Sequence, residues 1–126
     1  MSLFIDSLKL RLLLLASIPL LRRAERRSAR LRELLHEDSF VLQIRTADGV
    51  GGYYRLRGGV LSLHRGEHRR PDFTQHWQRS SDALRVMLSR DETDMLRAVE
   101  GGQCQLQGRF AVALWFNEAM KIARAA

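Results

Sequence analysis

The chain has one cysteine and two prolines among its 126 residues. A single cysteine, Cys104, excludes an internal disulfide framework and a cysteine-rich zinc site. The longest apolar run, 12–21, is about half of the roughly 20 residues that a membrane-spanning helix requires. Acidic residues are also in the minority. The chain has 14 Asp and Glu and 21 Lys and Arg, which gives a net charge of +7 and a pI near 10.9. This balance indicates an anionic partner, which could be nucleic acid, a membrane surface or an acidic protein.

Residues that could carry catalysis or hold a metal are sparse. Cys104 falls on the predicted inward face of a strand, which indicates a packed thiol rather than a nucleophile. A predicted helix is preceded or opened by Asp91, Glu92 and Asp94. These carboxylates fit helix capping better than general acid–base catalysis. Four histidines lack the spacing of metal ligands and are expected at the surface: His36, His64, His68 and His76. We therefore predict no enzymatic activity, no metal and no cofactor.

The first 36 residues are predicted to form a helical segment in two pieces. Pro19 divides them, because proline fits the first turn of a helix and disrupts its interior, and Ser17 could cap the second piece. Lys9 and Arg11 before the apolar run give the segment a superficial similarity to a signal peptide. No small-x-small cleavage pattern follows, so we expect the segment to be retained. Dimerisation through residues 3–21 is an alternative use of its leucines.

The second helical piece, 19–36, has leucines on one side and arginines on the other. The arginines could form a solvated face with ion pairs to Glu25 and Glu33. They could instead lie at lipid headgroups, as in an interfacial helix. The protein would then be cytoplasmic and bind peripherally to the inner face of the membrane. A nucleic-acid arm is disfavoured, because no aromatic residues interleave with them. The residues proposed for the membrane or a partner are Arg22, Arg23, Arg26, Arg27 and Arg30.

From residue 37 the pattern changes to alternating apolar and polar residues. This period predicts strands at 40–45, 53–57, 60–64 and 72–78, with Asp48 and Gly49 as a hairpin turn between the first two. Two helices follow, from Ser80 to about residue 90, with Ala83, Leu84, Met87 and Leu88 as the apolar stripe, and from about 91 to 100. Gln103–Gln107 alternates again and predicts a fifth strand.

The C-terminal block, from Glu100 onward, combines a glycine turn, a short strand and an amphipathic helix. Gly102, Cys104, Leu106 and Gly108 precede a helix that begins near Phe110. This pattern resembles the C-terminal signature of the sterol carrier protein type 2 family, which are small lipid-binding domains. The order of elements over about residues 20–126 is similar as well. The layout of the N-terminal helices is also similar to that of bacterial relatives in this family that assist ubiquinone assembly.

The resemblance implies an α+β fold with a five-stranded mixed sheet that helices cover on one face. It divides the chain into an N-terminal helical segment, 1–36, packed on a sterol-carrier-like domain, 37–126. Gln75 stands at an inward position where the family often has an apolar residue, which implies a narrower or more polar tunnel. The strands also carry more arginine than the family's usually do, at Arg45, Arg55 and Arg57.

The residues expected around an apolar cavity between sheet and helices are large and adaptable. They are Leu42, Leu56, Leu61, Phe73, Trp77, Leu84, Met87, Leu88, Met95, Leu106, Trp115, Phe116 and Met120. Two functions follow. One is a non-enzymatic carrier of a lipid, sterol or isoprenoid that docks on anionic membrane through the basic helix. The alternative is an adaptor with the same fold and a filled core that binds a protein partner through the arginine-rich helix.

Overall fold

The computed structural model describes residues 2–125, with side chains from Phe4 to Ala125. Leu3, at the start of the segment considered for dimerisation, lies outside the described side chains. Ten elements follow one another along the chain: α1 (Ser2–Glu25), α2 (Ala29–Glu37), β1 (Phe40–Thr46), β2 (Gly51–Arg57), β3 (Val60–Arg65), β4 (Phe73–Trp77), α3 (Ser80–Leu88), α4 (Thr93–Glu100), β5 (Cys104–Gly108) and α5 (Phe110–Ala125).

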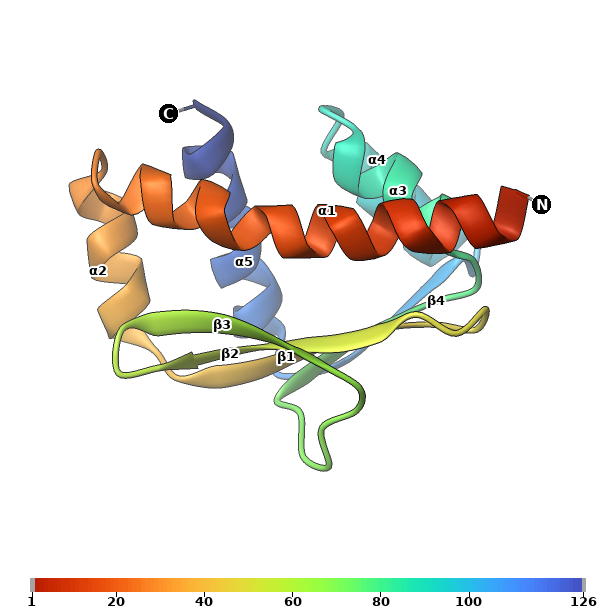
Figure 1. The fold of residues 1–126 in the computed structure, drawn as a ribbon, viewed down its shortest axis with the longest axis horizontal. Coiled ribbons are helices and arrows are strands. Elements are labelled where there is room, and N and C mark those ends of the chain that lie inside the picture. The colour runs from red at the N-terminus through yellow and green to blue at the C-terminus, as the bar shows by residue number, and fades with distance from the viewer. Residues whose placement is uncertain (1, 126) are drawn as a thin grey trace.

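The five strands form one mixed sheet in the order β3-β2-β1-β4-β5. Neighbouring strands are antiparallel except β1 and β4, which are parallel and place Leu42 opposite Phe73. All helices lie on one side of the sheet, and the loop between β3 and β4 lies on the other (Figure 1). The predicted α+β fold is therefore confirmed.

Period-two alternation places the large side chains of the strands under the helices. Tyr54, Phe73 and Trp77 are among the largest fully buried residues. Gln75 also faces inward, and its side-chain oxygen accepts a hydrogen bond from the Trp77 indole Nε1–H at 3.2 Å. This bond satisfies the polar group in the core, as buried amides require. The core is one cluster that runs from Leu10 in α1 to α5.

The predicted helix break at Pro19 is wrong. α1 continues through Pro19 to Glu25, and the chain turns at residues 26–28 instead. Ser28 then caps α2 by accepting a hydrogen bond from the backbone N–H of Leu31 at 3.1 Å. An interior proline costs a helix about 3 kcal/mol. Burial of the α1 leucines against the domain offsets that cost, so the helix stays continuous.

A buried polar link holds α1 on the sheet beside this proline. Ser17 does not act as the predicted cap; its hydroxyl donates to the carbonyl oxygen of Leu14 at 2.5 Å. The Ser17 and Tyr54 hydroxyl oxygens lie 2.6 Å apart, so β2 and α1 share a hydrogen bond within the core. Burial raises the pKa of the Tyr54 phenol to about 12, an effect that the Ser17 hydrogen bond partly opposes.

The start of α3 is held from a distance rather than by its own serines. Asp48, in the β1–β2 turn, accepts hydrogen bonds from the Ser80 backbone N–H at 3.1 Å and from the Ser80 hydroxyl at 2.8 Å. Partial burial raises the pKa of the Asp48 carboxyl, but hydrogen bonds from Thr46 and Ser80 outweigh it, so the net pKa is lowered.

At the other end of α3, Leu88 is 65% exposed and does not join the predicted apolar stripe, where Val86 is buried instead.

Within the described residues, no helix combines the length and the apolar character that a bilayer crossing needs.

Candidate ligand pocket

A pocket of about 490 Å³ lies between the C-terminal half of α1, the helix α2 and the beginning of β3. β3 is an edge strand, so nothing pairs with its outer side in the described sheet. α1 runs above the sheet, and α2 rises at one end of it (Figure 1). The pocket is lined by Ile18, Leu21, Arg22, Glu25, Arg26, Leu31, Arg32, Leu35, Gly59, Val60, Leu61 and Trp115.

The pocket has an apolar floor and a cationic rim. Leu21, Leu31 and Leu61 are buried on its floor. The polar lining consists of Arg22 and Arg26, which lie four residues apart on the α1 side, Arg32 on the α2 side, and one acid, Glu25, so cations predominate. The Arg32 guanidinium donates to the backbone carbonyl oxygen of Glu25 at 2.7 Å. An apolar interior with convergent cations at the mouth suits an amphiphile that has an apolar tail and an acidic head.

Trp115 forms a wall of the pocket and fixes α5 against α2. Its indole Nε1–H donates to the carbonyl oxygen of Leu34 at 2.7 Å, and its ring meets Phe40 edge to face at 4.9 Å. A second hollow of about 240 Å³ lies between α2 and α5 and is also lined by Trp115. Trp115 therefore borders both hollows.

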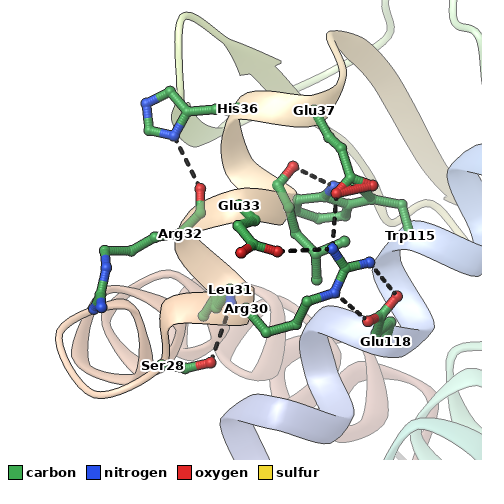
Figure 2. A network of polar contacts seen from close by, with 10 residues as sticks. Ser28, Arg30, Leu31, Arg32, Glu33, His36, Glu37, Trp115 and Glu118 are labelled. Atoms are coloured by element: carbon green, nitrogen blue, oxygen red, sulfur yellow. Dashed lines mark hydrogen bonds and ion pairs between the residues drawn. The ribbon is translucent and has the colours of Figure 1, made fainter.

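Arg30 belongs to an ion-pair network rather than to the pocket rim. Its guanidinium contacts Glu118 of α5 at 2.9 Å, Glu37 at 3.0 Å and Glu33 at 3.3 Å, as Figure 2 shows. Its pKa is raised by the hydrogen bonds to Glu118 and Glu33. The network ties α2 to α5 and neutralises this cation. Among the described residues, no carboxylate pairs with the four other arginines of the predicted basic group: Arg22, Arg23, Arg26 and Arg27.

The residues predicted to line a cavity fall into four groups. Leu61 and Trp115 line the pocket. Leu88 is exposed at the end of α3. The remainder fill the interior between sheet and helices. Those fully or nearly buried are Leu42, Leu56, Phe73, Trp77 and Leu84, and those partly buried against the core are Met87, Met95, Leu106, Phe116 and Met120.

Sequence reasoning missed the α1 and α2 side of the pocket. The lining includes Ile18, Leu21, Leu31 and Leu35, which the sequence assigns to the N-terminal helical segment. Their apolar spacing was visible in the sequence, but nothing local indicated that the β2–β3 turn would lie beside them. That proximity depends on the order of strands in the sheet.

The described residues offer little reactive chemistry near the pocket. Cys104 is buried in β5, at the sheet edge opposite β3, and burial raises the pKa of its thiol to about 12, which keeps it protonated. No group of three or more potential metal ligands occurs among the described histidine, cysteine and carboxylate side chains.

Comparison with solved structures identifies the fold. The chain superimposes on "UbiJ-SCP2 Ubiquinone synthesis protein" with a TM-score of 0.68 and 16% identity over 90% of this chain and 96% of that one. The sterol carrier protein domain 2 of Helicoverpa armigera matches with a TM-score of 0.58 and 15% identity, over 88% of this chain and 87% of its own. Sterol carrier protein 2 from Yarrowia lipolytica, in its apo form, matches with a TM-score of 0.55 and 11% identity, over 84% and 88%.

No protein-family model matches the sequence, and no curated protein matches it either. The structural matches alone show that the chain has the sterol carrier protein 2 fold, because the sequence identities are low. The C-terminal glycine–strand–helix pattern predicted this fold.

Proposed function

We propose that this chain is a non-enzymatic lipid-binding module that holds an apolar tail in the pocket between α1, α2 and β3. The observation that carries the proposal is the combination of a leucine floor with Arg22, Arg26 and Arg32 at the rim of one pocket. Two solved structures with this fold are named sterol carrier proteins, which supports a lipid as the class of ligand.

The ligand would be a lipid, sterol or isoprenoid. Each methylene group removed from water contributes about 0.8 kcal/mol without directional contacts, so the floor selects for apolar length rather than for one chemical identity. The similar structure named a ubiquinone synthesis protein makes an isoprenoid tail a ligand to test first.

Docking on an anionic membrane is the second part of the proposal. Arg22, Arg23, Arg26 and Arg27 gather where α1 ends, and Arg22 and Arg26 also belong to the pocket rim. Each cation near an anionic surface contributes about 1 kcal/mol. Docking at this end would bring the pocket mouth to the headgroups from which a lipid is taken.

The test is to fill the pocket from its rim. Val60 is 60% exposed and lines the pocket, so Val60→Trp adds an indole without removing core packing. Displacing about four methylene groups of a bound tail would cost about 3 kcal/mol, or about a hundredfold in Kd. Titration with a fluorescent prenyl or acyl probe measures the change.

The matched control is Leu96→Trp, because Leu96 is 57% exposed on α4 and does not line the pocket. It should leave the Kd unchanged. Equal affinity for V60W and the original chain would contradict the placement of the tail, and no uptake by any variant would contradict lipid binding.

The packed interior favours a second candidate, an adaptor with a filled core. Most of the residues expected around a cavity are buried against one another, as Leu42, Phe73 and Trp77 are. Such a protein would use the arginines at the end of α1 to bind an acidic protein surface. It would purify without lipid in native mass spectrometry, and its complex would weaken steeply with salt.

A further inference from the structure

α1 is apolar on both of its sides. Its inner side packs on the domain, where Leu10, Leu14 and Leu21 are buried. Its outer side carries a second row of large apolar residues, here named the outer stripe. The outer stripe consists of Phe4, Ile5, Leu8, Leu12 and Leu15, which are 75%, 42%, 48%, 55% and 58% exposed.

The outer stripe is continuous along the helix. Phe4, Leu8, Leu12 and Leu15 are separated by four, four and three residues, which is the spacing of one helical face. At 1.5 Å per residue the row extends roughly 16 Å. α1 crosses α5 and α3 in Figure 1 and packs on them and on β3 with its inner side. The residues of the outer stripe are exposed, so this side of α1 is turned away from those elements. Helices that are apolar all round are normally covered on both sides.

The charges around the outer stripe are positive. Lys9 and Arg11 lie on its two edges when the helix is viewed down its axis, and Arg22 and Arg23 continue beyond Leu15. The Arg11 guanidinium donates a hydrogen bond to the carbonyl oxygen of Gly49 in the β1–β2 turn at 3.3 Å, so Lys9, Arg22 and Arg23 are the cations that extend beside the stripe. The carboxylates of α1 lie elsewhere, because Asp6 is half-buried on the inner side and Glu25 lines the pocket. The outer face of α1 therefore combines exposed leucines with cations and no opposing acid.

We infer that the outer stripe of α1 enters the headgroup region of an anionic bilayer, with Lys9 beside the stripe and Arg22 and Arg23 beyond its end at the phosphates. This inference rests on the membrane docking proposed above, and it adds the element that inserts. Apolar residues flanked by Lys and Arg are the pattern of helices that lie in the membrane interface. A second copy fits less well, because pairing two α1 helices along the outer stripe would bring Lys9 and Arg11 against each other's cations without a carboxylate between them.

Insertion can be read at a single position with an environment-sensitive fluorophore. Leu12→Cys introduces an exposed thiol at the centre of the outer stripe, whereas native Cys104 is 1% exposed with its thiol pKa raised to about 12 and stays unlabelled. Gln105→Cys, on the open face of the sheet, is the matched control, because Gln105 is exposed on the strand face opposite Cys104.

Vesicles of phosphatidylcholine with phosphatidylglycerol should shift the emission of the label at position 12 to shorter wavelength and leave the label at 105 unchanged. Vesicles of phosphatidylcholine alone should have a much smaller effect. An equal response at both positions, or none at position 12, would overturn the inference. A blue-shifted label at position 12 without vesicles, in a chain that elutes as a dimer, would also overturn it in favour of a second copy.

A variant separates insertion from lipid uptake. Leu12→Gln keeps the charge of the chain and should weaken partition to anionic vesicles about tenfold, because a leucine no longer enters the interface. It should leave the binding of a dispersed lipid probe unchanged, since Leu12 does not line the pocket. Leu96→Gln, another exposed leucine, should change neither. V60W should lose binding of the lipid probe and keep normal binding to vesicles. That result would show that the pocket and the outer stripe act separately.

Discussion

The hydrogen bond between Ser17 and Tyr54 supports an asymmetric prediction about how α1 is attached to the sheet. Ser17→Ala removes the close partner of a phenol that is 1% exposed and leaves it only the Leu14 carbonyl oxygen, at 3.4 Å. Tyr54→Phe removes the phenol oxygen, but Ser17 keeps its hydrogen bond to Leu14 at 2.5 Å. Ser17→Ala thus leaves a buried polar group without a good hydrogen-bond partner, whereas Tyr54→Phe leaves none unpaired.

The magnitudes follow from that difference. A buried donor left without a good partner costs about 1–3 kcal/mol, from which the higher helix propensity of alanine subtracts about 0.5 kcal/mol. We therefore expect Ser17→Ala to lower the free energy of unfolding by about 1–2 kcal/mol. Tyr54→Phe should cost about 1 kcal/mol or less, because every remaining polar group stays paired. The double variant should be no less stable than Ser17→Ala alone.

Urea unfolding followed by the fluorescence of Trp77 and Trp115, both of which are buried, measures all three variants. Alkaline pH gives a second reading. The Tyr54 pKa is raised to about 12 in the folded chain, above the ordinary value of about 10, so the stabilisation is present below pH 10 and is lost as pH rises towards 12. The original chain should lose stability relative to Tyr54→Phe over that window. A Tyr54→Phe variant as unstable as Ser17→Ala at neutral pH would refute this account.

Three further predictions concern single positions. Asp48→Asn should lower the free energy of unfolding by about 1–2 kcal/mol at pH 7, because the carboxylate accepts two hydrogen bonds from Ser80. The pKa of the Asp48 carboxyl is lowered in the folded chain, so this loss of stability should shrink as pH falls below about 4. A loss that is independent of pH would contradict the prediction. Gly108→Ala should destabilise the chain by more than about 1 kcal/mol in thermal unfolding, because φ is +115° and the new Cβ would overlap the Asp72 carbonyl oxygen; an unchanged Tm would contradict that geometry. The Cys104 thiol should react with a maleimide only as fast as the chain unfolds, which mass spectrometry can follow in increasing urea, and rapid labelling of the native chain would show that it is accessible.

The strands and the C-terminal helices could be predicted from the sequence because their signals are local. Alternation in 53–57 and 72–78 sets which side chains face the helices, and Gly108, which adopts a positive φ, marks where β5 ends. Gln75 was expected to face inward, and it does, with the Trp77 indole as its partner. The five-stranded mixed sheet followed from these patterns together with the resemblance of the C-terminal block.

The tertiary structure decided where the first helix ends and where a ligand could bind. Pro19 is a strong local signal, yet α1 passes through it because the domain buries the inner face of both flanking turns, with Leu14 and Ser17 before the proline and Leu21 and Ala24 after it. The attachment of Arg30 to Glu118 and the contact of Asp48 with Ser80 join residues that lie far apart in the chain. No local pattern reports such pairs.

The sequence by itself therefore determined the five strands, the helices after residue 79 and the positive charge of the chain. The position of the pocket depended on sheet order, since only the placement of β3 at the edge brings Leu61 beside Leu21 and Leu31. The same packing chose which side of α1 is buried. Both sides of that helix are apolar, so periodicity could not distinguish the leucines that enter the core from those that remain exposed on the outer stripe.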